Sequence, residues 1–214
     1  LSLLTINGFA SLEVVSARVA KPFAADRDGI NIGEAAAVFL MTRVPMPGFP
    51  EGEPIGLLGY GASSDAWHMS SPRPDGEGAL QAIQAALQGA GLSAGDLGWI
   101  NLHGTGTAQN DAMESLAVVQ TLGVDVPGTS TKPHTGHTLG AAGALEAAIV
   151  WGLVSRQLNP SGALPAQGNE RDPSLAPLRL TRPGDRWPSG RRLGLSTSFA
   201  FGGNNMALIM GDTA

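Results

Sequence analysis

The segment Leu97-Gly98-Trp99-Ile100-Asn101-Leu102-His103-Gly104-Thr105-Gly106-Thr107 decides the fold of this chain. Its first part, residues 97–102, is a short apolar run that predicts a buried strand, and His103 follows directly in a glycine-rich loop. The periodic apolar pattern of residues 111–122 then predicts a helix. Open α/β sheets place their chemistry at the carboxyl ends of strands, so His103 is a candidate functional residue.

A second histidine repeats this arrangement. Residues 135–143 read Thr-Gly-His-Thr-Leu-Gly-Ala-Ala-Gly, and their histidine, His137, lies 34 positions after His103. It follows an apolar run at residues 126–130 and precedes a helical pattern over residues 140–157. The two histidines are therefore expected at the ends of neighbouring strands.

The rest of the chain completes an α/β pattern. We expect a helix over residues 79–90 and three further strands, at 55–61, 193–198 and 206–210. Strands that alternate with helices predict βαβ units on a parallel or mixed sheet.

Three flanking segments are less regular. Residues 30–41 predict two strands joined at Gly33-Glu34, after a turn at Asp28-Gly29, and the proline-rich run of residues 44–54 ends this piece. Residues 1–20 have helical spacing but no recognisable cap at their start. The six prolines of residues 158–191 predict an extended connection with little regular structure.

Composition limits the class of protein. Charged residues make up 14% of the 214 residues, against about 25% in typical domains, which predicts a large subunit interface. The net charge is −5 and no basic run occurs, so a nucleic-acid or anionic-membrane partner has no support. No apolar stretch reaches the roughly 18 residues of a membrane span and no signal peptide is recognisable, so we expect a cytoplasmic protein.

The chain contains no cysteine, which excludes disulfides, thiolate metal sites and a thiol nucleophile from this polypeptide. The four histidines lack the spacing of a zinc site, and we expect no metal. Phosphate-binding glycine patterns are absent, and so is the Gly-x-Ser-x-Gly pattern of a serine hydrolase.

The residues alone leave two interpretations of the histidine loops open. His103 either caps the following helix or has its ring at a strand end for chemistry. His137 stands beside a helix start, whose partial positive charge favours a neutral imidazole. Lys132, five positions earlier, either adds a positive charge to this loop or is a solvated lysine.

Five stretches of sequence, taken together, resemble the C-terminal part of a β-ketoacyl-acyl carrier protein synthase, one of the thiolase-fold condensing enzymes. The resemblance covers almost the whole chain, and it implies an α/β fold with two parts. Residues 51–214 correspond to the second thiolase-like half, with the order βαβαβαββ and a mixed five-stranded sheet, and residues 1–50 to the tail and closing strands of the first half. The stretches are Pro-Phe-Ala-Ala-Asp-Arg-Asp-Gly with Gly33-Glu34, His-Gly-Thr-Gly-Thr-Ala-Gln-Asn-Asp, Ser-Thr-Lys-Pro-His-Thr-Gly-His, Leu-Gly-Ala-Ala-Gly-Ala-Leu-Glu-Ala, and Ser-Thr-Ser-Phe-Ala-Phe-Gly-Gly-Asn-Asn.

The resemblance also implies a reaction, decarboxylative Claisen condensation between an acyl group on a cysteine and a malonyl-carrier thioester. Catalytic roles then fall to His103 and His137, which aid loss of carbon dioxide and stabilise the enolate, and to Lys132, which maintains the charge and hydrogen-bond network. Glu114 and Asp111 match acidic positions of the family, and Glu114, expected to pair with the lysine region, is counted with the catalytic residues. The cysteine is expected on an N-terminal portion upstream of this chain.

Substrate-binding residues are implied in the same way. Thr105 and Thr107 match threonines that bond the phosphopantetheine arm, which arrives on the acyl carrier protein, so we expect no cofactor of the chain's own. Phe201, with Phe199 and Gly202, matches the gate of the acyl pocket. The family's Gly-Phe-Gly-Gly-Thr-Asn reads Ala-Phe-Gly-Gly-Asn-Asn at residues 200–205, and the departures at Ala200 and Asn204 affect loop mobility and pocket shape. Alanine at a hinge that requires positive φ costs about 1 kcal/mol, so a stiffer gate is expected.

The expected partners are the N-terminal half that carries the cysteine, an acyl carrier protein, and a second subunit in a homodimer or a ketosynthase/chain-length-factor heterodimer. The alternative function is a non-catalytic, chain-length-factor-like partner, against which the intact histidine loops count. Residues 1–214 expressed alone are expected to expose strand edges and apolar faces, and so to be poorly soluble.

Overall fold

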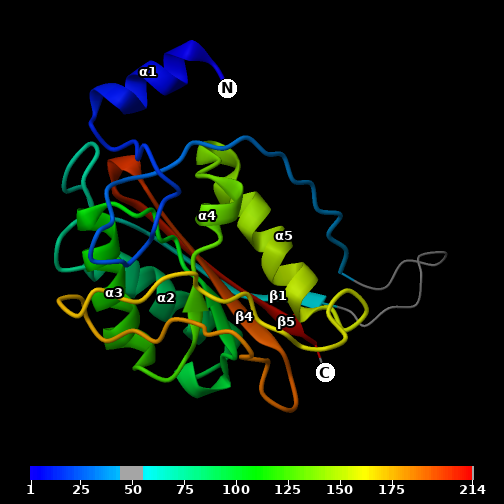
Figure 1. Cartoon of the computed structure of the whole chain (residues 1–214). Helices are drawn as coiled ribbons and strands as arrows, with labels where there is room; N and C mark the ends of the chain where they lie inside the picture. Colours follow the sequence, from blue (N-terminus) through cyan, green and yellow to red (C-terminus); the bar gives the residue numbers. More distant parts are fainter. Residues whose placement is uncertain (44–54, 214) are drawn as a thin grey trace.

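The computed structural model describes residues 1–43 and 55–213 of the chain. Its centre is a five-stranded mixed sheet in the order β1-β5-β4-β2-β3 (Figure 1). Strands β1, β5 and β4 pair antiparallel, whereas β4, β2 and β3 run parallel. The strands are β1 (Ile55–Ser64), β2 (Trp99–Asn101), β3 (Gly128–Thr129), β4 (Leu193–Ala200) and β5 (Asn204–Asp212).

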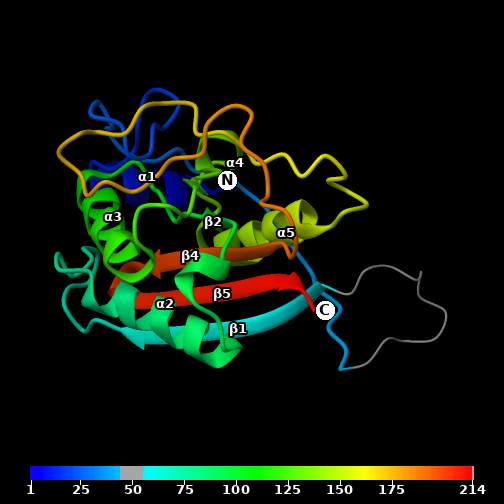
Figure 2. The ribbon, with the colours of Figure 1, turned by 90° about the horizontal axis from the view of Figure 1, so that it is seen from below.

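Helices cover both faces of the sheet, giving three layers. Helices α2 (Glu77–Ala90) and α3 (Ala108–Leu122) lie on one face and α5 (Ala142–Val154) on the other, as Figure 2 shows for α2 and α5. The first face is filled by aliphatic residues such as Ile83, Leu195 and Ile209, and the second by Trp99, Val150 and Trp187. Ile83 and Leu87 of α2, and Val150 and Val154 of α5, are buried in these two cores. The shorter helices are α1 (Leu3–Ser11), η1 (Ala94–Asp96), α4 (Lys132–Thr135), η2 (Leu139–Ala141) and η3 (Phe201–Gly203).

Helix α2 packs very closely on β1. A Cβ atom at Gly61 would lie 2.0 Å from the carbonyl oxygen of Ala82, so only glycine allows this approach. The glycine-rich composition of β1 therefore sets the spacing between the two layers.

The two edges of the sheet differ. Strand β3 is only two residues long, but the connection of residues 158–191 continues beside it, because Gly128 donates to the carbonyl of Arg179 and Thr181 donates to that of Gly128. The ten-residue strand β1 pairs only with β5 among the described residues. One edge is covered and the other is open.

The parallel strands β2 and β3 carry the predicted site loops at their carboxyl ends. Leu102 donates its N–H to Thr129, which keeps the two strand ends together. The loop after β2 holds His103 and leads into α3, and the loop after β3 leads through α4 to His137 and α5.

The predicted element order and the mixed five-stranded sheet are confirmed, and the connection of residues 158–191 has no named helix or strand. The two strands predicted within residues 30–41 are wrong: Ile30 and Ile32 form isolated bridges and residues 33–42 have no regular secondary structure. Strand propensity was present, but the described neighbours bond only to the backbone of residues 30–33, through single bridges that do not extend into a ladder. The start of α1 does have a cap, since Ser2 Oγ accepts from the N–H of Thr5. The proline-rich run of residues 44–54 lies outside the described residues.

None of the helices in the described part of the chain combines the length and hydropathy needed to cross a membrane.

Candidate active site

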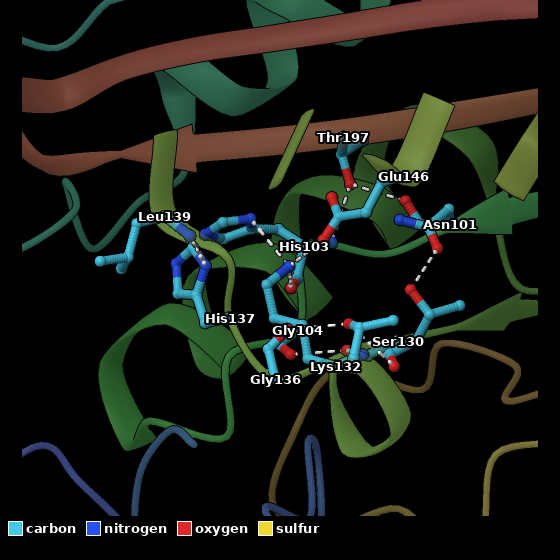
Figure 3. A network of polar contacts seen from close by, with 12 residues as sticks. Asn101, His103, Gly104, Ser130, Lys132, Gly136, His137, Leu139, Glu146 and Thr197 are labelled. Atoms are coloured by element: carbon cyan, nitrogen blue, oxygen red, sulfur yellow. Dashed lines mark hydrogen bonds and ion pairs between the residues drawn. The ribbon is translucent and has the colours of Figure 1, made fainter. Parts of the chain in front are cut away.

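The two predicted histidines meet at the carboxyl ends of β2 and β3. The ring centroids of His103 and His137 lie 5.3 Å apart with an interplanar angle of 84° (Figure 3). The main chain of His137 is fixed from the N-terminal segment: its N–H donates to Asn31 O over 2.6 Å, and Gly33 donates back to His137 O. His103 is buried and His137 is half-buried.

Hydrogen bonds assign the proton positions of both rings. His137 Nδ1 accepts from the N–H of Leu139 at 3.3 Å, and His103 Nδ1 lies 3.4 Å from Lys132 Nζ, which can only donate. In neutral imidazoles the remaining proton then resides on Nε2 of each ring. Burial, assisted by the charge of Lys132, lowers the pKa of His103 well below its ordinary value and that of His137 to about 3. Both rings are therefore neutral hydrogen-bond donors.

Lys132 lies at the centre of the polar network in Figure 3. It is 2% exposed and is 2.5 Å from Glu146 Oε1, on α5, and it also donates to the carbonyl oxygen of His103. Burial raises the pKa of Glu146, and the lysine opposes that rise. Glu146 is a site residue that was not predicted, and its one sequence signal is that it is the only charged residue within α5.

The expectation that Glu114 pairs with the lysine region is wrong. Its carboxylate instead accepts the N–H groups of His103 and Gly104, each over 2.7 Å, and lies 3.0 Å from Thr197 Oγ1. Burial raises the pKa of Glu114 to about 7. Glu114 thus fixes the backbone that carries His103, while Glu146 forms the ion pair with Lys132.

Thr105 and Thr107 have their hydroxyl oxygens 2.9 Å apart in the loop after β2. Thr107 also caps α3 by accepting from the N–H of Asn110. Asp111 accepts the N–H of Gly106 at 3.2 Å, and burial raises its pKa to about 6. Both threonines lie in the loop that holds His103, and their binding of a carrier arm stays a prediction.

The turn between β4 and β5 brings aromatic side chains to the same end of the sheet. Phe199 is buried, with its ring 5.8 Å from that of His103. Phe201 is 50% exposed and stacks on Phe9 of α1 at 5.9 Å. Residues 200–204 are called the phenylalanine loop below.

The expected stiffening of this loop by Ala200 is wrong. Ala200 has φ −107° and ψ 161°, an extended conformation that alanine adopts without strain. The positive φ of the loop falls on Gly202, at 80°, and on Gly203.

The described residues also form an open groove of about 920 Å³, lined by residues 166–171, 177–183 and Asp185. None of the predicted site residues lines it. The chemistry therefore concentrates at the histidine pair, where two N–H donors beside a buried positive charge can stabilise an oxygen that becomes negative.

A three-layer α/β unit with this histidine pair defines a thiolase-like condensing-enzyme half. Residues 56–162 match the family model described as "Beta-ketoacyl synthase, C-terminal domain", and the chain belongs to this family. Among similar sequences is a 3-oxoacyl-[acyl-carrier-protein] synthase 2 from Synechocystis sp., 34% identical over 96% of this chain and 50% of the relative. Another of that name, from Rhizobium meliloti, is 35% identical over 97% of the chain and 50% of its own length.

Solved structures show the same likeness. A Xenorhabdus doucetiae ketosynthase in complex with its chain length factor matches with TM-score 0.82 and 44% identity, over 100% of this chain and 51% of that chain. A β-ketoacyl synthase from Burkholderia phymatum matches with TM-score 0.80 and 31% identity, over 100% of this chain and 53% of that chain. The chain thus spans about half the length of the relatives it matches.

Proposed function

We propose that this chain supplies the enolate-stabilising part of a ketosynthase that performs decarboxylative Claisen condensation in fatty acid or polyketide synthesis. The observation that carries the proposal is the pair His103 and His137, whose rings lie 5.3 Å apart and whose Nδ1 atoms both face N–H donors, which leaves Nε2 of each neutral ring as the protonated nitrogen. Such donors stabilise an oxyanion without first having to take up a proton.

The reaction has two steps at this pair. The bond between the malonyl carboxylate and the α-carbon breaks, carbon dioxide leaves, and the electron pair passes to the α-carbon and the thioester oxygen. His103 and His137 donate hydrogen bonds to that oxygen, and Lys132 adds a fixed positive charge nearby. The α-carbon then forms a bond with the acyl carbonyl carbon, and the cysteine thiolate departs.

The proposal requires a cysteine, which we assign to an N-terminal portion of the same enzyme. Three observations support that partner: the chain has no cysteine, it spans half of its relatives, and its N-terminal segment exposes large apolar side chains. These side chains are Leu3, Leu4, Val38, Leu40 and Met41. A partner that covers them also accounts for the low charge content, and the poor solubility of the isolated chain stays a prediction.

In the proposed function, Thr105 and Thr107 bind the phosphopantetheine arm of an acyl carrier protein. The acyl chain would pass the gate formed by Phe199, Phe201 and Gly202. No resident cofactor is needed, and the enzyme would act in the cytoplasm as a homodimer or a heterodimer.

Removal of the histidines tests this function. In the complete enzyme, with its N-terminal portion, His103→Ala and His137→Ala should each lower malonyl-carrier decarboxylation by about 10²–10³-fold, the effect of deleting an oxyanion donor. His134→Ala is the matched control, because His134 is an exposed residue of the same loop. Decarboxylation at the wild-type rate in both active-site variants contradicts the proposal.

The second candidate is a chain-length-factor-like partner without catalysis of its own. It is favoured by the structural neighbours that are ketosynthase and chain-length-factor complexes. Under this alternative, the double variant of His103 and His137 leaves condensation by the assembled complex unchanged, whereas the catalytic proposal expects its loss.

A further inference from the structure

Phe23 has an unusual backbone conformation for a buried aromatic residue. Its φ is +65°, in the left-handed region that favours glycine, and its side chain is 0% exposed. Residues held in such conformations persist where the surroundings over-determine them, and they cluster at functional sites.

Two distant parts of the chain clamp this backbone. The N–H of Phe23 donates to Asp111 Oδ2, on α3, over 2.7 Å, and its carbonyl accepts the N–H of Asp172 over 2.7 Å. Arg27 also contacts the carboxylates of both aspartates, at 2.7 Å from Asp172 and 4.0 Å from Asp111. Figure 1 shows the dark blue N-terminal segment beside α3.

The ring of Phe23 reaches the residue that follows His103. A Cβ atom on Gly104 would lie 2.9 Å from Phe23 Cε2, so the ring lies directly against the Gly104 backbone. On its other sides Gly104 donates to Glu114 Oε2 and accepts from Ser130 Oγ over 2.6 Å. Asp111 also accepts the N–H of Gly106, so one carboxylate joins Phe23 to the same loop.

We propose that Phe23 is a positioning residue for the enolate site: its clamped backbone presses the ring against Gly104 and so fixes the direction in which His103 points. This inference rests on the proposed function for its catalytic consequence. Phe23 touches no substrate and acts only through the loop after β2.

The test compares Phe23→Leu with a control core substitution in the complete enzyme. Phe23→Leu should lower kcat for malonyl-carrier decarboxylation at least tenfold with little change in KM, while acyl transfer to the cysteine stays within threefold. Ile83→Ala is the control, since Ile83 belongs to the same core on α2, which carries no residue of the site. If Phe23→Leu and Ile83→Ala have equal thermal stability and lower kcat for decarboxylation by the same factor, the proposal is overturned.

A second variant distinguishes the effect of the Phe23 ring from that of the positive-φ backbone. Glycine adopts positive φ freely, so Phe23→Gly is compatible with the turn and removes the whole side chain, ring included. It should be as slow in decarboxylation as Phe23→Leu, and wild-type kcat in this variant overturns the role of the ring.

The ¹⁵N chemical shifts of the His103 imidazole provide a readout that needs no turnover. They should change in both Phe23 variants and not in Ile83→Ala. If the wild-type enzyme has no decarboxylase activity, the proposed function fails, whereas shifts unchanged by Phe23→Leu contradict the positioning role itself.

Discussion

The histidine network and the phenylalanine loop lie at the same end of the sheet but are built differently. His103, Lys132 and Glu146 are each less than 5% exposed and are linked by charged hydrogen bonds, whereas Phe201 is half exposed. The phenylalanine loop has positive φ only at its glycines. One region is thus held by a buried network of charged hydrogen bonds, while the other exposes an aromatic side chain on a turn with two positive-φ glycines.

The largest effect is expected at Lys132. Lys132→Met leaves Glu146 as an uncompensated buried carboxylate, which typically costs about 3–5 kcal/mol of stability. Chemical unfolding of the complete enzyme measures this loss. The double variant Lys132→Met/Glu146→Gln should recover part of it, because glutamine carries no charge; a single variant as stable as wild type contradicts the buried pair.

The pH dependence of stability tests Glu114. Its pKa is raised from 4.5 to about 7, so the native protein keeps a proton that the unfolded chain releases between these values. Stability therefore falls as pH rises from about 4.5 to 7, by up to about 1.4 kcal/mol per pH unit for this group. Glu114→Gln should remove that slope in unfolding measurements at several pH values. An unchanged slope means that Glu114 is ionised throughout.

A smaller effect is expected in the phenylalanine loop. Phe201→Ala removes the stack on Phe9, a contact worth about 0.5–1.5 kcal/mol, and opens the gate. Acyl transfer to the cysteine should change several-fold and lose chain-length selectivity, with decarboxylation within about twofold. If Phe201→Ala lowered decarboxylation as much as His103→Ala does, the phenylalanine loop would be part of the decarboxylation site, and the two regions would not have separate roles.

The smallest effect is expected at Ala200. Since this residue is already extended, Ala200→Gly should alter acyl transfer by less than twofold and stability by about 0.5–1 kcal/mol. Stopped-flow acylation would measure the rate. A several-fold faster gate in the variant would show that the alanine does restrict the loop.

The positions of the two site histidines could be predicted, because they depend on residues that are close in the sequence. His103 and His137 each follow a short apolar run in a glycine-rich loop, so their place at strand ends could be read from neighbouring residues. The partner of Lys132 could not: Glu146 lies 14 positions later in a helix whose pattern is otherwise apolar, and only the packing of α5 brings its carboxylate to the amine.

The wrong strand prediction has a related cause. Residues 30–41 have the apolar residues of strands, but β propensity largely reflects packing against neighbouring strands, and the described chain provides none there. The positive φ of Phe23 was equally hidden, because that conformation is imposed by Asp111 and Asp172 from distant segments.

The unequal edges of the sheet imply two time scales of hydrogen exchange. The amides of Gly128 and Thr181, each bonded across the covered edge beside β3, should exchange slowly with solvent water. The outward amides of the open edge at β1 should exchange within seconds, unless another polypeptide strand aligns with them. Exchange at β1 in the assembled enzyme would thus report whether that edge remains open.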